Sequence, residues 1–340
     1  MTRRAATLFL LMIVSGRAND ARQIGKMRGV CWEAVGKVGA GELAPLKDVG
    51  VNWISQTPFG WCRSVHSPDV ILATGARVYW GESDEGLVET ARAARAIGIR
   101  TLLKPHLWVG HRDWVGDLKM ESESDWKAWF GSYEKFILHY AELAEREHFD
   151  ALAVGTELCG TSSRAADWKR LIAKIRSVYH GPLTYCANWE EAERVAFWKD
   201  LDFIGVQAYY PLSAAAHPTP AELRASWERI GGRLETLSGR EGRPVVFTEI
   251  GYRSVAGAVK EPWNWETDGG ADLQIQSEAY EALYDRLWDK AWFGGTFIWK
   301  WNPYRGSGKR APRDSDRDFT PQGKPALDVI RAYYREKSRR

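Results

Sequence analysis

Cysteine is scarce in this chain of 340 residues: there are four, with no Cys-x-x-Cys pair and no cluster of Cys with His. That scarcity argues against a structural zinc site, and no metal ligand is expected. Four cysteines would still allow two disulfides, and neighbouring predicted strands would bring together Cys31 with Cys62 and Cys159 with Cys186. Free buried thiols are the alternative. The sequence leaves this choice open.

An excess of charge of one sign is also missing. The 47 Lys and Arg residues nearly balance 44 Asp and Glu, for a formal net charge of +3. No basic stripe interleaved with aromatics is present, which argues against a nucleic-acid partner. Residues 306–309, Gly-Ser-Gly-Lys, lack the spacing of a phosphate-binding loop and are expected to form a mobile loop. No cofactor is expected.

Long apolar runs are limited to the N-terminus, where Arg3 and Arg4 precede residues 5–14 and small residues follow at Gly16 and Ala18. This order is typical of a secretory signal peptide cleaved after Ala18, and the run is too short to span a bilayer. An uncleaved anchor is the alternative. We therefore expect a signal segment at 1–18, a single catalytic domain at 23–340, and export to the periplasm or the outside. No stable membrane partner is expected, and the oligomeric state is not predicted.

Short, nearly continuous apolar runs alternate with helical patterns along the rest of the chain, as expected for parallel strands covered on both faces. The helical patterns carry ordinary punctuation, such as the capping box with Pro at the first helical position in Thr219-Pro220-Ala221-Glu222. Eight such strands over about 300 residues predict a single (β/α)8 TIM barrel. A doubly wound sheet is the alternative, but the glycine-rich turn that dinucleotide binding needs is absent. The predicted strands are 27–32, 51–56, 101–106, 151–157, 183–188, 203–207, 245–249 and 295–299. The predicted helices are 43–49, 87–97, 126–145, 219–237, 273–288 and 326–334.

Two of these strands end on a glutamate that follows a threonine: Thr156-Glu157 and Thr248-Glu249. A carboxylate is costly to bury and rarely ends a core strand without a role. Strands four and seven of a barrel present their ends on one face, so the two carboxyls should converge there. Paired carboxyls across a glycosidic bond are the machinery of glycoside hydrolysis.

Tryptophan is unusually abundant, with 18 residues. For any one of them, core packing is the simpler explanation. Their concentration at one set of strand ends, together with amides and two acids, instead indicates a sugar-binding face. The seven at predicted strand ends are Trp32, Trp53, Trp61, Trp108, Trp189, Trp299 and Trp301.

The chemistry sets requirements for the two carboxyls. A general acid must hold its proton near neutral pH, so its pKa is expected to be raised by an apolar or anionic environment. The nucleophile must stay ionised, which calls for hydrogen-bond donors and positive charge. Tyr209 is a candidate donor, and Arg28 or Arg253 is a candidate positive charge.

The chain resembles glycoside hydrolase family 113, a family of β-mannanases within the large clan of retaining barrels. The stretches that carry the resemblance are 155–158 (GTEL), 104–108 (KPHLW), 247–252 (FTEIGY), 299–301 (WKW) and 318–325 (DFTPQGKP). They span roughly residues 27–334 in barrel order. The resemblance implies that Glu157 is the acid/base and Glu249 the nucleophile, with Tyr209 bonded to the nucleophile. It also implies that Trp299 is the platform under the reacting sugar.

The resemblance and the strand ends together predict a larger set of substrate-binding residues. Thr156 stands where the wider clan usually has Asn, a departure that the mannanase family shares. For His106 a structural role is the alternative, and Asp150, Asp202, Glu190 and Glu191 are expected to be solvated, capping or paired groups. The predicted substrate-binding residues are Trp32, Lys104, His106, Trp108, Thr156, Asn188, Trp189, Gln207, Tyr209, Trp299 and Trp301.

Other functions remain open. Fold alone does not determine function, so a non-hydrolytic glycan-binding barrel or a transglycosylase stays possible. Within hydrolases the rival substrate is another β-linked glycan, because mannan and glucan differ at one epimeric hydroxyl. The expectation is a retaining hydrolase of β-1,4-mannan whose partner is carbohydrate.

Overall fold

The computed structural model describes residues 25–33, 36–73, 75, 78–304 and 316–336. The expected signal segment at 1–18 and the loop at 306–309 lie outside these residues. Among the described residues no helix is both long and apolar enough to span a bilayer, and no group of three or more His, Cys, Asp or Glu could hold a metal ion.

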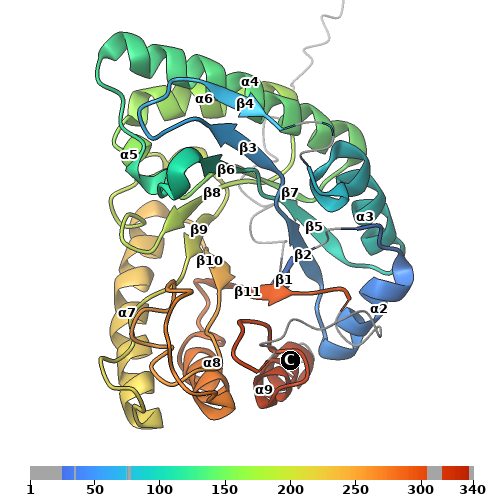
Figure 1. Cartoon of the computed structure of the whole chain (residues 1–340), viewed down its shortest axis with the longest axis vertical. Coiled ribbons are helices and arrows are strands. Elements are labelled where there is room, and N and C mark those ends of the chain that lie inside the picture. The colour runs from blue at the N-terminus through green and yellow to red at the C-terminus, as the bar shows by residue number, and fades with distance from the viewer. Residues whose placement is uncertain (1–24, 34–35, 74, 76–77, 305–315, 337–340) are drawn as a thin grey trace, which may run out of the picture.

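Eight strands close into an all-parallel barrel in the order β1-β11-β10-β9-β8-β7-β5-β2 (Figure 1). Every neighbouring pair is parallel, including the closing pair β1 and β2. The prediction of one TIM barrel is confirmed. The strands are β1 (Met27–Trp32), β2 (Trp53–Gln56), β5 (Arg100–Leu103), β7 (Ala151–Thr156), β8 (Leu183–Asn188), β9 (Ile204–Gln207), β10 (Val245–Ile250) and β11 (Phe293–Trp301).

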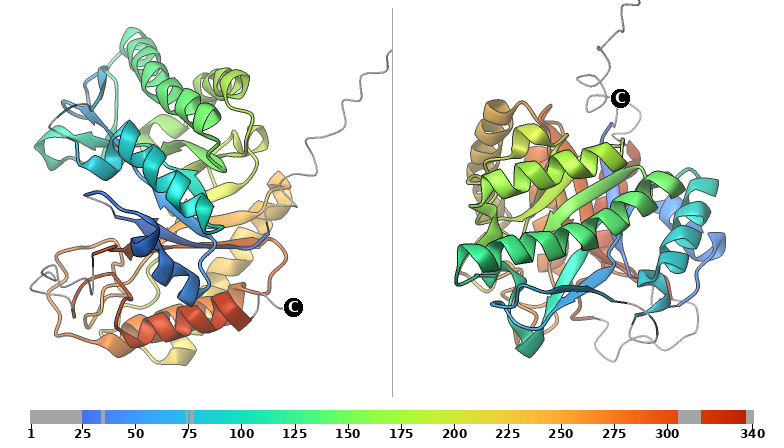
Figure 2. Two further views of the ribbon diagram at one scale, coloured as in Figure 1. Left: turned by 90° about the vertical axis from the view of Figure 1, so that its right-hand side faces the viewer. Right: turned by 90° about the horizontal axis from the view of Figure 1, so that it is seen from above.

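Helices surround this barrel, and α4 and α6 lie side by side across one flank (Figures 1 and 2). The predicted capping box at Thr219 starts α7, with the side chains of Thr219 and Glu222 bonded to each other's backbone. Two features differ from the prediction: α6 was not predicted, and β8 and β9 are joined only through the short 3-10 helix η5 (Trp198–Asp200). The main helices are α2 (Ala40–Val49), α3 (Asp84–Ala96), α4 (Glu123–Glu147), α6 (Ala165–Val178), α7 (Pro220–Glu241), α8 (Leu273–Leu287) and α9 (Pro325–Glu336).

A second, three-stranded sheet stands outside the barrel and was not predicted. Its order is β4-β3-β6, with β3 (Phe59–Cys62), β4 (Val70–Leu72) and β6 (His106–Val109). The predicted strand 101–106 is therefore wrong at its end, because β5 stops at Leu103 and His106 opens β6. Pro105 lies between them and has no N–H to donate to a ladder.

The inside of the barrel is filled by a small apolar cluster distinct from the larger core between strands and helices. Trp53 belongs to this inner cluster, where it starts β2 and is buried, so its assignment to the aromatic rim is wrong. Gly295 permits close strand contact there: at φ +126° a side chain would be strained, and a Cβ would lie 2.0 Å from Met27 O. The inner cluster is Met27, Cys31, Trp53, Leu102, Ala151, Phe203, Val246 and Phe297.

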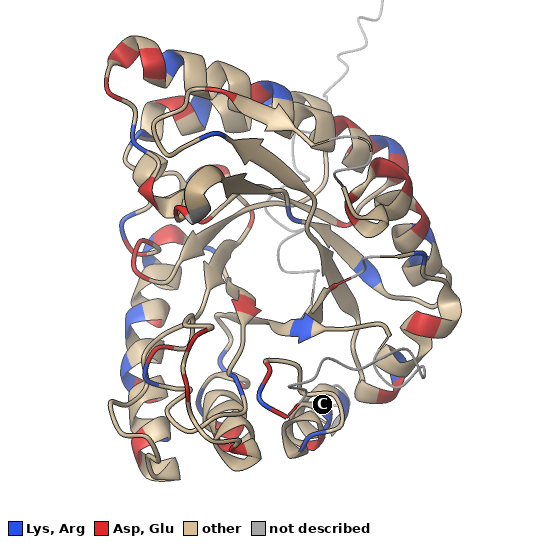
Figure 3. Ribbon diagram, viewed as in Figure 1, with Lys and Arg blue, Asp and Glu red and all other residues tan. Residues whose placement is uncertain are grey.

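All four cysteines are free thiols, so neither of the two pairings forms. Cys31, Cys62 and Cys186 are buried and Cys159 is partly exposed. Charged residues of both signs are spread over the surrounding helices, while the barrel strands carry few (Figure 3). The few charged residues at the ends of the barrel strands are therefore exceptional and need specific partners.

Candidate active site

Strand irregularities stand directly beside both glutamates. In the pairing of β10 with β9 the register shifts between Phe247 and Glu249, and in the pairing of β7 with β8 it shifts between Ala153 and Thr156. A bulge bends its strand and redirects the following side chains, and bulges are common beside active sites. The side chain of Glu249, near the end of β10, and that of Glu157, just after β7, therefore project in directions that a regular ladder would not provide.

The Glu249 carboxylate is almost completely buried, and each of its oxygens has a donor. Lys104 Nζ, from the end of β5, donates to Oε1 and forms a buried ion pair with it. Tyr209 Oη, just after β9, donates to Oε2 at 2.9 Å. A buried carboxylate is tolerable only when it is paired and hydrogen-bonded in this way. Both carboxylate oxygens of Glu249 are thus occupied by donors, one of them a cation.

The cation beside Glu249 differs from the one predicted. Arg28 Nε donates to Gly50 O, and Arg253 binds the backbone oxygens of Arg317 and Thr267, so neither serves the carboxylate. Lys104 takes that role: burial alone would lower its pKa, but the Glu249 charge outweighs burial and raises it. Burial and the Glu249 charge raise the pKa of Tyr209 well above its usual value, so its phenol remains a donor.

Glu157 has a different environment. Its backbone adopts φ 54°, which is uncommon for a side chain of this size and typical of functional positions that the surrounding structure imposes. Its amide donates to Cys186 O at 2.9 Å, and its Oε2 lies 3.5 Å from His106 Nε2. His106 Nδ1 lies 2.7 Å from the Leu107 amide and 3.0 Å from Leu107 O, so backbone contacts hold the ring with Nε2 towards Glu157.

The pKa of Glu157 is lowered, against the expectation for a general acid. Burial raises it, but the hydrogen bond and charge of His106, the charge of Lys104 and a hydrogen bond from Asn188 together outweigh burial. The expected rise in pKa assumed no charged neighbour for the acid, whereas His106 is its direct partner. In the unliganded protein Glu157 is therefore a carboxylate.

The two carboxyls share their surroundings through one short segment. Lys104 contacts Glu249 and His106 contacts Glu157, and only Pro105 separates them. Lys104 acts electrostatically on both glutamates, and Tyr209 is influenced by both. The predicted convergence of strands four and seven is thus realised.

Trp299 lies beside this pair, with its ring centroid 5.8 Å from Lys104 Nζ. The Trp299–Lys300 peptide bond is cis. Trp265 meets Trp299 edge-on at 6.4 Å, and Lys300 lies 5.5 Å from the Trp265 ring and is ion-paired with Glu33. The half-buried Trp299 ring therefore stands next to the nucleophile, where the resemblance places a sugar platform.

Several predicted substrate-binding residues are buried and bonded to the protein itself. Thr156 donates its hydroxyl to Pro105 O at 3.0 Å, which fixes the segment carrying Lys104 and His106. Gln207 accepts from Thr248 Oγ1 at 2.9 Å. These contacts support the carboxyls from behind, so Thr156, Gln207 and Lys104 act as positioning residues. Trp32 and Trp301 are also buried.

Of the remaining predicted residues, Asn188 and Tyr209 are buried, and His106, Trp108, Trp189 and Trp299 are at least partly exposed. Asn188 caps β8, and Trp189 stacks on Trp263 at 5.7 Å. Trp108 is the most exposed of them and lies on β6, outside the barrel. Trp263 and Trp265 were not among the predicted site residues, because exposed tryptophans in a loop carry no periodic signal.

Glu191 was also underestimated. It is fully buried, and its Oε1 accepts from Tyr185 Oη at 3.0 Å and from the Asn188 amide at 3.1 Å. Burial outweighs these hydrogen bonds and raises its pKa. Glu191 therefore fixes the end of β8, from which Asn188 reaches the acid.

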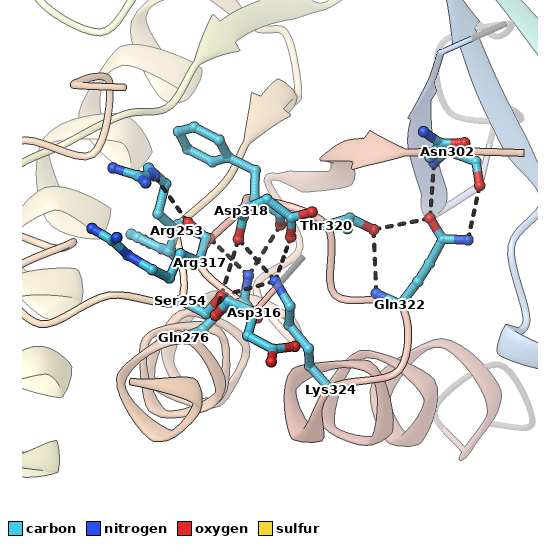
Figure 4. A network of polar contacts seen from close by, with 12 residues as sticks. Arg253, Ser254, Gln276, Asn302, Asp316, Arg317, Asp318, Thr320, Gln322 and Lys324 are labelled. Atoms are coloured by element: carbon cyan, nitrogen blue, oxygen red, sulfur yellow. Dashed lines mark hydrogen bonds and ion pairs between the residues drawn. The ribbon is translucent and has the colours of Figure 1, made fainter. Parts of the chain in front are cut away.

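The segment 316–324 braces the last strand from outside (Figure 4). Gln322 Oε1 accepts from the Asn302 amide at 2.8 Å, and Gln322 Nε2 donates to Asn302 O at 3.0 Å. Lys324 donates to Ser254 Oγ at 2.8 Å and pairs with Asp318. This network explains why the 318–325 stretch accompanies the site: it ties the end of β11, with Trp299, to the loop after β10.

Comparison with known proteins agrees with this geometry. The family model of Glycoside Hydrolase Family 113 matches residues 32–324. The structure is similar to that of the GH113 beta-mannanase AaManA from Alicyclobacillus acidocaldarius in complex with ManMIm, with 29% identity, a TM-score of 0.80 and coverage of 92% of this chain and 98% of that one. It is also similar to a GH113 beta-1,4-mannanase structure, with 25% identity, a TM-score of 0.79 and coverage of 92% and 99%.

A beta-galacturonidase of family GH2 from Eisenbergiella tayi, at 15% identity and a TM-score of 0.56, shares the fold, with 92% of this chain and 51% of that chain covered. A sequence search among curated proteins finds no match. The match to the family model over most of the chain, together with the two mannanase structures, leads to one assignment. The chain belongs to glycoside hydrolase family 113.

Proposed function

We propose that this glycoside hydrolase cleaves β-1,4-linked mannan with net retention, with Glu249 as nucleophile and Glu157 as acid/base. One observation carries the assignment of roles: the two carboxyls at the same barrel end have opposite kinds of partner. Glu249 is bonded to a buried ammonium and a phenol, whereas Glu157 faces a histidine and is partly open to solvent. A group that must exchange protons needs the second environment.

In the first step Glu157, after taking up a proton from solvent, gives that proton to the glycosidic oxygen while the bond from that oxygen to the anomeric carbon breaks. Glu249 attacks the anomeric carbon from the opposite face and forms a glycosyl ester. Trp299, beside Lys104, supports the apolar face of the reacting sugar. In the second step Glu157, now a carboxylate, takes a proton from water as that water attacks the anomeric carbon, and Glu249 leaves as a carboxylate.

Lys104 couples the two steps. In the free protein its charge is balanced by Glu249. Once Glu249 is esterified, that balance disappears and the unneutralised ammonium lowers the pKa of Glu157 further, because it acts on Glu157 already. Glu157 is thereby kept in its ionised form at the stage at which it must accept a proton from water.

The mannan assignment is supported by the two structures that the chain resembles, which are named beta-mannanases. Purified protein should be tested on mannan, glucan and galactan, and on matching manno-oligosaccharides, with the anomer of the first product followed by NMR. Retained configuration and preference for mannan are expected. Preference for another β-glycan would refute the substrate, and an inverted product would refute double displacement. Binding of glycan without turnover, or transfer to sugar without hydrolysis, would favour the glycan-binding or transglycosylase alternative.

The two roles can be separated with azide and an activated aryl β-mannoside. Glu249→Ala should lose turnover by about 10⁴-fold or more, and azide should restore some of it as the product of inverted configuration. Glu157→Ala should spare the first step on the activated substrate, and azide should give the retained product. Exchanged outcomes would reverse the assignment.

We also propose that the chain is exported. Residues 1–18 have the order of a signal peptide. Burial raises the pKa of Cys31 and Cys62 to about 12 and that of Cys186 to about 11, which protects these free thiols from oxidation outside the cytoplasm. N-terminal sequencing of protein recovered from outside the cytoplasm should begin near Asn19. Retention of intact chain in the cytoplasm would contradict export.

A further inference from the structure

The outward face of the small β4-β3-β6 sheet carries a strip of exposed aromatic side chains. Trp61 on β3 is directly opposite Trp108 on β6 and Ile71 on β4. Their exposed fractions are 44%, 57% and 52%, and all three belong to the few large apolar residues left exposed in the described part of the chain. Partners in register project from the same face of a sheet, so the three form one apolar surface.

Folding does not require these aromatics. The opposite face of the sheet is the one that packs inward: a Cβ on Gly60 would lie 2.6 Å from the Phe136 ring of α4 and 2.8 Å from Leu107. Cys62 on the same strand is buried. An exposed apolar patch of this kind, next to a functional site, marks a binding surface.

The strip is continuous with the acid/base. His106, which contacts Glu157, opens β6 and lies opposite Phe59. The Phe59 ring lies 5.5 Å from His106 and stacks on Trp108 at 4.8 Å and 24°. Aromatic surface therefore leads step by step from Glu157 to Trp108 and then to Trp61.

We propose that this strip binds the sugars on the leaving-group side of a β-linked mannan chain. The inference rests on the proposed function, because it is the acid that marks the leaving-group side: Glu157 protonates the bond to those sugars. Trp299, by contrast, stands beside the nucleophile, where the sugar that stays on the enzyme must lie. Flat indole faces suit the C–H surfaces of neutral sugars and add little ordering cost. A strip of this reach fits a substrate that extends beyond the cut on the leaving-group side.

Binding is tested with Trp61→Ala, Trp108→Ala and the double variant, each combined with Glu249→Ala so that the ligand stays intact. Calorimetry should show weaker binding of mannohexaose by about five- to tenfold for each indole removed. Trp61→Phe should restore part of the affinity. The matched control is Tyr79→Ala, which removes an exposed aromatic elsewhere and should bind as the parent does. Equal affinity in all variants would overturn the proposal.

Cleavage position gives a second readout with the active enzyme. With mannohexaose labelled at its reducing end, the parent should place several sugars on the leaving side. Trp61→Ala and Trp108→Ala should shift the cut towards the labelled end and lower the ratio of kcat/KM for the hexaose to that for the triose. An unchanged pattern would refute the strip as a leaving-side surface. So would a change from dimer to monomer in light scattering, because the face would then be a contact between copies.

Failure of the proposed function gives a different result from failure of this inference. If the parent cleaves another β-glycan, the same variants are compared on that glycan by affinity electrophoresis. Loss of retardation in Trp61→Ala would then support the strip as a binding surface and refute mannan as the substrate. Full turnover of mannan by the parent, with no effect of either substitution, would instead support the proposed function and refute the strip.

Discussion

Glu249 and Glu157 lie at the same end of the barrel, but they are stabilised by different kinds of residue. Glu249 is paired with Lys104, which is permanently charged and fully buried, and with the Tyr209 phenol. Glu157 faces the partly exposed imidazole of His106, and it carries a strained backbone. The nucleophile thus has a fixed charge as its partner, Lys104, next to a barrel strand. The acid/base has an adjustable partner, His106, which belongs to the outer sheet.

This contrast shows that one barrel can give its nucleophile and its acid/base different surroundings, because their partners come from different parts of the fold. Lys104 ends a barrel strand, and moving it would disturb the ladder. His106 starts β6, whose other residues form the aromatic strip. Substrate bound on that strip therefore lies against the residue that sets the protonation of Glu157.

Removing the fixed charge should have the largest effect. Lys104→Met leaves Glu249 buried without its cation, which should lower the free energy of unfolding by about 3–5 kcal/mol. It should also lower kcat by about 10²–10³-fold. Urea titration and steady-state kinetics of the purified variant measure these two changes.

The matched control is Lys300→Met. Lys300 is also a cation beside Trp299, but its partner Glu33 is partly exposed. Its loss should change the stability by no more than about 1 kcal/mol. Comparable destabilisation in both variants would show that the burial of the Lys104 pair is not what matters.

The barrel itself and the Tyr209 hydrogen bond to the nucleophile were within reach of the sequence, but the Lys104 and His106 partners of the two carboxyls were not. The apolar pattern and the residues that flank it locate strands such as β8 with the correct first and last residue. The Thr-Glu pairs at the ends of strands four and seven identify the acids. A bulge has no such signal, because it depends on how the neighbouring strand is shifted. Arg28 was expected near Glu249, yet its position at the start of β1 puts it at the opposite end of the strand from the carboxyls.

The outer sheet was missed for a related reason. Its strands have three or four residues, too short for a pattern of alternation to stand out. Phe59-Gly60-Trp61-Cys62 and His106-Leu107-Trp108-Val109 do alternate exposed and buried side chains. Reading Pro105 as a strand terminator would have separated β6 from β5 and placed His106 and Trp108 on the same surface as Trp61.

Changing the adjustable partner should have a smaller effect than removing the fixed one. His106→Asn removes the charge and most of the hydrogen bonding that lower the pKa of Glu157. The acid must be protonated for kcat/KM, so raising its pKa should move the alkaline limb to higher pH, with a change in kcat/KM of about three- to tenfold. His111→Asn is the control, since His111 is exposed and its φ of 61° suits Asn. An unmoved alkaline limb would show that His106 does not act on Glu157.

The smallest expected effect concerns the support of the acid/base rather than either carboxyl. Glu191 is buried and its pKa is raised, so the folded protein holds this proton more tightly than the unfolded chain does. Stability is then fully present below the unfolded value of 4.5 and falls as pH rises through the raised pKa. Glu191→Gln keeps an oxygen for Tyr185 and the Asn188 amide but cannot ionise. Its free energy of unfolding should match that of the parent below pH 4.5 and exceed it increasingly as pH rises through that window.

Because Asn188 keeps its position, the pH–rate profile should stay within about twofold of the parent at every pH. Urea titrations across the pH range measure the first expectation, and a constant difference at all pH values would mean that Glu191 does not titrate in the folded protein. A large loss of kcat without a change in stability would instead make the Glu191 carboxylate itself part of the acid/base, which would end the division between a fixed and an adjustable half of the site.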